Sequence, residues 1–204
     1  MTPPRIPHAG LVPWILASAV ALAGLCASSP AHGTTLVRMS LDELATTNST
    51  IFVGEVVDLH SYWNHDGTFI LTDVVVETDA QLKGRRTKEA LRTVTLPGGT
   101  VGDLTTLLVG GPRLEIGVSY VLFASEAEMP GAGAVTTIRN HAQGVFELVE
   151  ATDGDVMAVS QASTLDLMAD RNQLKTAPGG AEGLAFDALL DRVTDILATE
   201  EVDR

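Results

Sequence analysis

Cysteine is nearly absent from this sequence, since Cys26 is the only one in 204 residues. A single thiol excludes a disulfide framework and a cysteine-rich zinc module within one chain. Basic residues are scarce as well: 13 lysines and arginines stand against 26 aspartates and glutamates, for a formal net charge of -13. This balance argues against general nucleic-acid binding, because contacts to phosphates need a basic surface. The length suits one domain, alone or with an appendage.

Residues 1–33 have the order of a secretory signal peptide. Arg5 is the charged residue at the start, an apolar run covers residues 11–27, and small residues follow it. Cleavage is expected after Ala31 or after Gly33, because both positions fit the small-x-small rule. No twin-arginine pair precedes the apolar run, so the sequence predicts export by the general secretory route, to the periplasm or out of the cell.

Two other interpretations of this first segment stay open. One is a retained membrane anchor, although the apolar run is short for a span, Pro13 interrupts its start and no basic cluster follows it. The other is lipidation at Cys26, but Leu25 stands where a lipobox needs Gly or Ala. After cleavage the exported chain has no thiol, so its stability must come from packing and hydrogen bonding.

The start of the exported chain carries a helix signal. Ser40 and Glu43 have the spacing of a capping box, and Met39 and Leu44 stand at the staple positions around it. The pattern predicts a short helix over residues 41–47. At the other end of the chain, an apolar stripe from residue 186 to residue 197 predicts a helix that docks on the β domain or receives a partner helix.

Between these helices the pattern is that of β-strands. Alternating apolar residues predict a long, curved hairpin over residues 51–62 and 68–82, with an Asp-Gly turn between its strands. Gly54 inside the first strand predicts a bulge or a sharp bend. Further short strands are expected over 91–96, 104–109, 118–125, 135–138, 144–149 and 156–159. Residues 163–182 are expected to hold a weak helical segment followed by a linker.

Five short motifs carry a resemblance to a known fold. In this sequence they are IFVGEV at 51–56, LKG at 82–84, LPGG at 96–99, GPRLEIG at 111–117 and YVLF at 120–123. Together they resemble uncharacterised exported bacterial domains related to the netrin and metalloproteinase-inhibitor type of OB barrel. The resemblance covers about residues 36–150 and implies a protein-binding role. The inhibitors use a cysteine at the mature N-terminus, which this chain lacks, so that chemistry does not carry over.

The fold class expected from these patterns is mainly β. We predict a small OB-like antiparallel β-barrel of about six strands, with a short N-terminal helix and one or more C-terminal helices. The chain then divides into a cleaved signal peptide over 1–33, the barrel domain over 34–160 and a C-terminal helical extension over 161–204.

A basic cluster is the most unusual local feature of this acidic chain. Its five members lie within ten residues and stand out against the acidic background: Lys83, Arg85, Arg86, Lys88 and Arg92. Tyr62 and Trp63, on the preceding hairpin, add aromatic area of the kind that interfaces favour, although Trp63 also suits a core. We therefore expect these seven residues to form a surface for an exported protein or an envelope component.

No motif in the sequence indicates catalysis or a cofactor. It has no HExxH pair, no Gly-x-Ser-x-Gly elbow and no phosphate-binding loop. The expected function is an exported, non-enzymatic binding module with no metal or cofactor. The alternative is an exported hydrolase or metal-binding protein that uses His60, His65, Asp66 and His141, since histidine and aspartate are suitable zinc ligands.

Overall fold

The computed structural model describes residues 36–85, 89–164, 167–170, 173–177 and 183–202. The predicted signal peptide lies outside the described residues, so its cleavage stays a prediction. None of the described helices is long and apolar enough to cross a lipid bilayer.

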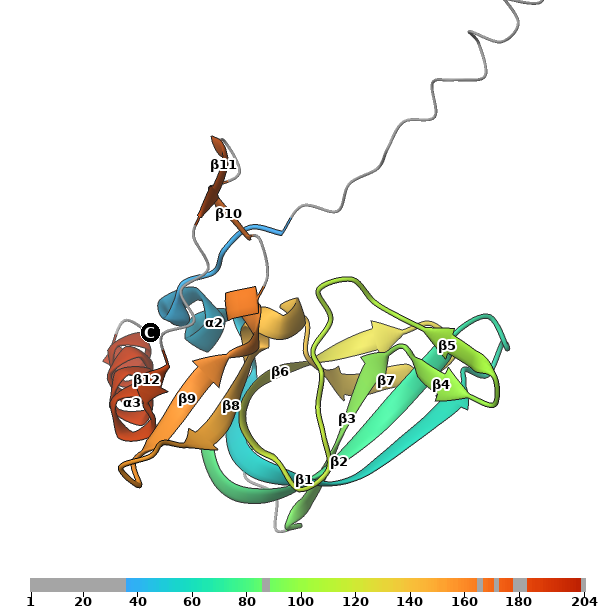
Figure 1. Ribbon diagram of the computed structural model, residues 1–204, viewed down its shortest axis with the longest axis horizontal. Helices are drawn as coiled ribbons and strands as arrows, with labels where there is room; N and C mark the ends of the chain where they lie inside the picture. Colours follow the sequence, from blue (N-terminus) through green and yellow to red (C-terminus); the bar gives the residue numbers. More distant parts are fainter. Residues whose placement is uncertain (1–35, 86–88, 165–166, 171–172, 178–182, 203–204) are drawn as a thin grey trace, which may run out of the picture. The chain divides into compact units, whose positions relative to one another are not determined.

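The fold is mainly β, as the sequence predicts. Eight strands form an antiparallel sheet in the order β12-β9-β8-β6-β1-β2-β3, with β7 paired to β6 outside this path (Figure 1). Their bounds are β1 Thr50–Trp63, β2 Ile70–Lys83, β3 Leu91–Pro97, β6 Ser119–Met129, β7 Gly133–Thr137, β8 Val145–Glu150, β9 Val156–Ser160 and β12 Leu184–Ala185. Two small hairpins lie outside this sheet: β4 Gly99–Val101 with β5 Leu104–Thr106, and β10 Leu167–Asp170 with β11 Gln173–Ala177.

The sheet differs from the expected small barrel in two respects. It has eight strands rather than about six, and β3 and β12 stand at the two ends of the pairing path. Among the described strands, no hydrogen-bonded pairing joins these ends, so no closed barrel is present. Seven of its strands fall in segments expected to be β, and the two-residue β12 adds the eighth by pairing with β9.

The hairpin of β1 and β2 bends where the sequence predicts it. Register shifts fall between Ile51 and Phe52, between Val53 and Gly54, and after Val56. A Cβ atom at Gly54 would lie 2.2 Å from the backbone oxygen of Glu77, so only glycine allows the strands this close. The extra residues at such bulges bend the strand and increase its twist.

Each face of the sheet carries its own apolar layer. The inner layer comprises Phe52, Val56, Val74, Val76, Val94, Leu96, Leu114, Tyr120, Leu122, Ala124, Ile138 and Val145. The helix-covered layer comprises Leu44, Ala45, Ile51, Val53, Val121, Phe123, Ala158, Leu189 and Val193. Neighbours such as Ile51 and Phe52 belong to different layers, because successive side chains of a strand point to opposite faces.

Two helices cover the second layer. Helix α2, Leu41–Thr47, begins with the predicted capping box: the Glu43 amide donates to the Ser40 hydroxyl, and the Glu43 carboxylate accepts from the Ser40 amide at 2.7 Å. Helix α3, Phe186–Val202, buries Leu189 and Val193 against the sheet and lies beside β9 (Figure 1). The expected docking of the C-terminal helix on the β domain is therefore confirmed.

The expected C-terminal extension is only partly helical. A 3₁₀ helix, η2 Gln161–Thr164, is followed by the hairpin of β10 and β11, within the segment expected to be weakly helical. Leu184 and Ala185 then pair with β9 as the edge strand β12. Leu36–Arg204 forms one compact unit, so the extension is not a separate body. The sequence did not predict β10 and β11, because strands this short show little alternation of apolar and polar residues.

Candidate functional site

The hairpin separates the aromatic and basic parts of the predicted partner surface. In the register of β1 and β2, Lys83 lies opposite Ile51, whereas Trp63 lies opposite Ile70. With a rise of about 3.3 Å per residue, the two ends are roughly 40 Å apart along the strand path. The structure therefore does not bring Tyr62 and Trp63 together with the cations in one patch.

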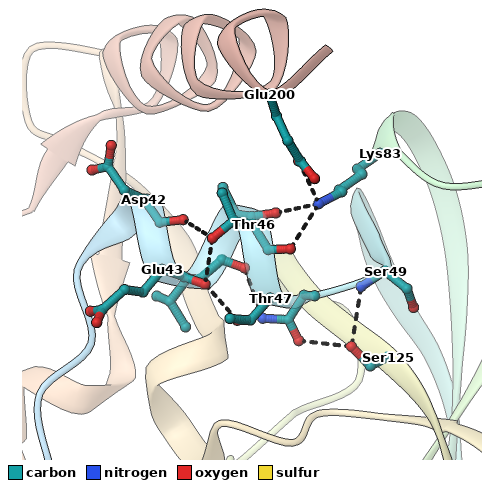
Figure 2. Close-up of polar contacts among 11 residues, drawn as sticks. Asp42, Glu43, Thr46, Thr47, Ser49, Lys83, Ser125 and Glu200 are labelled. Atoms are coloured by element: carbon teal, nitrogen blue, oxygen red, sulfur yellow. Dashed lines mark hydrogen bonds and ion pairs between the residues drawn. The ribbon is translucent and has the colours of Figure 1, made fainter. Parts of the chain in front are cut away.

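Lys83 is occupied by the fold itself. Figure 2 shows its ammonium group between the two helices, where Nζ donates to the carbonyl oxygens of Ala45 at 2.7 Å and Thr46 at 3.2 Å. The same atom pairs with Glu200 of α3 at 3.1 Å. Since the last turn of α2 has no basic residue, Lys83 supplies the cation that stabilises the carbonyl end of this helix.

Arg92 is occupied as well. Its guanidinium donates to Gln81 Oε1 at 2.7 Å and lies 5.2 Å from the centre of the Phe52 ring, a cation–π distance. A longer bond of 3.3 Å reaches the backbone oxygen of Arg85, whose side chain is exposed. Arg86 and Lys88 lie outside the described residues. Two of the three described cations of the cluster therefore stabilise the fold.

The aromatic pair divides in a similar way. The Tyr62 hydroxyl donates to Asp73 at 3.1 Å, and its ring stacks on His60 at 5.9 Å between centroids. Burial, with the nearby charge of Asp73, raises the pKa of Tyr62 above its ordinary value. Trp63 is 41% exposed and is not part of either apolar layer. Of the two rings, Trp63 is the one free to meet a partner.

The histidines of the alternative hypothesis do not gather. His60 belongs to β1 and stacks on Tyr62, and His65 and Asp66 lie in the turn that follows this strand. His141 opens the 3₁₀ helix η1, His141–Gly144, with a positive φ of 55°. Within the described part of the chain, no three His, Cys, Asp or Glu side chains are placed to hold a metal ion.

An exposed apolar segment is the feature that sequence reasoning missed. We call residues 104–109 the apolar loop. It follows the β4–β5 turn and exposes 81% of Leu107 and of Val109, with Leu104 and Leu108 also exposed. The sequence predicted a strand here, but β5 ends at Thr106. The run of uncharged residues in an acidic chain is the signal in the sequence that marks this segment.

A cavity of about 1100 Å³ lies beside the apolar loop. Leu107, Leu108 and Val109 line one side of it, and inner-layer side chains, among them Leu96 and Tyr120, line another. Carboxylates and hydroxyls also reach it: Ser61, Thr72, Glu115, Glu147 and Ser160. Apolar surface with a few polar groups is the usual composition of a small-molecule site.

Two glutamines, in the neighbouring 3₁₀ helices η1 and η2, fasten separate backbone segments. Gln143 is 5% exposed; its amide accepts from the Met39 N–H at 2.8 Å and donates to the Val37 carbonyl at 3.0 Å. Gln161 makes the same double contact with the backbone of Arg113, which lines the cavity. One clamp holds the segment that leads into α2, and the other holds the cavity wall.

The β6 strand is joined to α2 by a third polar contact. The Ser125 hydroxyl donates to Asn48 Oδ1 at 3.2 Å and accepts from the Ser49 amide at 3.2 Å (Figure 2). Asn48 in turn donates to the Leu44 carbonyl at 2.8 Å and so closes the end of the helix. These buried side chains satisfy one another and leave no group free for chemistry there.

No family model, curated protein or solved structure matches this chain. The resemblance to OB barrels therefore stays an expectation from the sequence motifs. What can be concluded about function rests on the apolar loop and the cavity.

Proposed function

We propose that this chain is an exported, non-enzymatic module that binds another protein through its apolar loop. The observation that supports the proposal is the exposure of Leu104, Leu107, Leu108 and Val109 in one short segment. Exposed apolar clusters of this kind mark interaction sites, because a monomer in water gains nothing from them. Export is part of the proposal through the signal-peptide order of residues 1–33.

The apolar loop replaces the basic cluster as the proposed contact surface. Lys83 and Arg92 already have internal partners, and binding an acidic protein through them would break those contacts. No residue from 104 to 112 is charged. The partner that fits is a protein with an apolar patch of its own, since burying aliphatic surface is favourable on both sides of an interface.

The OB-like character of the fold belongs to this proposal. A bulged, strongly bent β1–β2 hairpin and a sheet with an apolar inner face are features that such barrels share. These features support the resemblance, although the sheet is not closed among the described strands. In that reading the apolar loop is an extension of the domain that is available for a partner.

Site-specific cross-linking tests the proposal. A photoreactive residue is placed at Leu107, at Val109 or, as a control, at Val156, which is 41% exposed on β9. Irradiation of the producing cells should yield the same cross-linked protein from positions 107 and 109 but not from 156. The purified partner should then bind the chain directly, with an affinity that falls at least about tenfold in Leu107→Asp.

Two outcomes would contradict the proposal. One is a set of cross-links that does not differ between position 107 and the Val156 control. The other is binding to neutral phosphatidylcholine vesicles that Leu107→Asp abolishes, with no cross-linked protein, which would make the apolar loop a lipid contact instead. Contact with an anionic membrane is disfavoured, because Asp103 adjoins the apolar loop in a chain of net charge -13.

A further inference from the structure

A carboxylate and a phenol meet at one end of the cavity. Tyr120 of β6 and Glu147 of β8 are direct cross-strand neighbours, and both line the cavity. Glu147 alternates along β8 with Phe146 and Leu148, which pack in the helix-covered layer. Because side chains alternate between the faces of a strand, Glu147 points to the inner side, with Val145.

Glu147 has no cation to neutralise it within the described residues. No ion pair or hydrogen bond reaches its carboxylate there, although Arg113 also lines the cavity. Glu147 is half-buried at the cavity wall, where its charge attracts a cation more strongly than it would in open water. An inward carboxylate beside open space therefore favours a positively charged occupant of that space.

Tyr120 is the second polar group at this end of the cavity. It is 1% exposed, and its hydroxyl oxygen accepts from the Glu115 amide at 3.1 Å. In the described residues the O–H of Tyr120 finds no acceptor. Burial raises the pKa of Tyr120, and the nearby charges of Glu147 and Glu115 raise it further, so the phenol keeps its proton near neutral pH. A buried donor is thus available to a bound molecule.

Another part of the cavity lining is aliphatic and suits the hydrocarbon part of a ligand. Leu59, Val74, Leu96 and Leu114 line it with aliphatic surface. The hydroxyls of Ser61 and Thr72 already bond each other at 2.8 Å, and Thr72 also donates to the Gly98 carbonyl at 2.7 Å. These two hydroxyls therefore need no ligand. The pair of Tyr120 and Glu147 then offers a ligand one donor and one negative charge on neighbouring strands.

We propose that the cavity is a binding site for a small aliphatic amine that carries an oxygen near its nitrogen. The ammonium group pairs with Glu147, the oxygen accepts the O–H of Tyr120, and the hydrocarbon chain lies on the aliphatic surface of the cavity. The volume of about 1100 Å³ lies just above the usual range of small-molecule sites. This site does not depend on the apolar loop binding a protein.

Three probes with the same eight-carbon chain test the charge preference. They are 2-amino-1-octanol, 1,2-octanediol and 2-hydroxyoctanoate, and their binding to the purified chain is measured by isothermal titration calorimetry near pH 7. We expect the amine to bind about tenfold more tightly than the diol and the hydroxy acid to bind more weakly still, because an ion-paired hydrogen bond is stronger than a neutral one.

Two charge-matched variants locate the preference. Glu147→Gln should remove the advantage of the amine over the diol, whereas Glu77→Gln should retain it, because Glu77 is exposed and does not line the cavity. Both variants change the net charge equally, so general attraction of cations to an acidic chain affects them alike. Tyr120→Phe should weaken amine binding about threefold or more, and the amine should still bind more tightly than 2-hydroxyoctanoate.

Several results would overturn this site. One is that none of the three probes binds saturably. Another is that the amine binds Glu147→Gln and the unchanged chain with equal affinity. Leu108→Trp provides a check that does not alter Glu147, since this side chain lines the cavity and is exposed. If the larger ring leaves amine binding unchanged, the amine binds elsewhere. None of these results bears on the cross-linking at Leu107, so the two proposals fail separately.

Discussion

The two faces of the main sheet are completed in different ways. On the helix-covered face, α2 and α3 bury Ile51 and Phe123, and Lys83 finds three acceptors between the helices. On the inner face, the apolar layer ends at a cavity where Glu147 has no cation among the described residues and the adjoining apolar loop is exposed. Groups with partners inside the fold serve its stability, whereas a charged group beside open space is available for binding.

The largest difference in stability should lie between two leucine substitutions, one in the helix-covered layer and one in the apolar loop. Leu189 is 1% exposed under α3, and Leu107 is 81% exposed in the apolar loop. Leu189→Ala should lower the free energy of unfolding by about 2–5 kcal/mol, because it leaves a cavity in a packed layer. Leu107→Ala should change it by less than about 0.5 kcal/mol. Urea denaturation followed by circular dichroism measures both.

Equal losses in the two variants would remove the distinction between the faces. In that case the apolar loop would contribute to the folded core, and its exposure would no longer indicate a partner. A loss in Leu189→Ala below about 1 kcal/mol would instead show that α3 is not required to complete the helix-covered layer.

A smaller difference is expected between the two glutamine clamps. Gln143→Ala leaves the Met39 amide and the Val37 carbonyl without their partner in a buried setting, which should cost about 1–3 kcal/mol. Gln161→Ala releases the backbone of Arg113 at an exposed position, where water replaces the contact, so the cost should be about 0.5 kcal/mol. The same denaturation measurement applies.

Amide hydrogen exchange tells the two clamps apart by location. Gln143→Ala should speed exchange in the segment around Met39, while Gln161→Ala should speed it at Arg113 in the cavity wall. Exchange that rises at the same amides in both variants would mean that the two faces unfold together. The two faces would then differ in the folded structure but not in how they unfold.

Local signals in the sequence predicted the parts of the fold that depend on neighbouring residues. Ser40 and Glu43 are three residues apart, so the capping box could be read directly, and Gly54 marked the bulge of β1. The apolar stripe of α3 identified Leu189 and Val193 as the docked side. The pairing of β12 with β9 could not be predicted in this way, because a two-residue strand is defined by its partner.

The candidate site was predicted less well, for a physical reason. Closeness in sequence suggested that Lys83 and Arg92 formed a free surface, but their partners come from α2, α3 and Phe52, which lie far along the chain. The pair of Tyr120 and Glu147 depends on the register of β6 and β8. Without that register, Glu147 is one of 26 acids and has no distinguishing mark.

The smallest effect concerns pH and the helix-covered face. The Ser40 backbone N–H and, to a lesser extent, its hydroxyl hold the pKa of Glu43 below its ordinary value of 4.5. A carboxyl whose pKa is lower in the folded chain than in the unfolded chain stabilises the fold above the ordinary value. This contribution is lost as the pH falls through the lowered pKa, because the folded carboxylate must then take up a proton.

Glu43→Ala should therefore be less stable than the unchanged chain at about pH 7, and the gap should narrow as the pH falls below 4.5. Urea midpoints measured across this range show the trend. In a Ser40→Ala background the pH-dependent gap should shrink only in part, since the hydroxyl is lost but the backbone N–H, which is the larger cause of the lowered pKa, remains. A gap that persists unchanged at low pH would mean that Glu43 acts on α2 without its charge.

If amine binding near neutral pH is the same in Glu43→Ala and the unchanged chain, the two faces respond independently. A shared loss would mean that the helix-covered face also shapes the cavity.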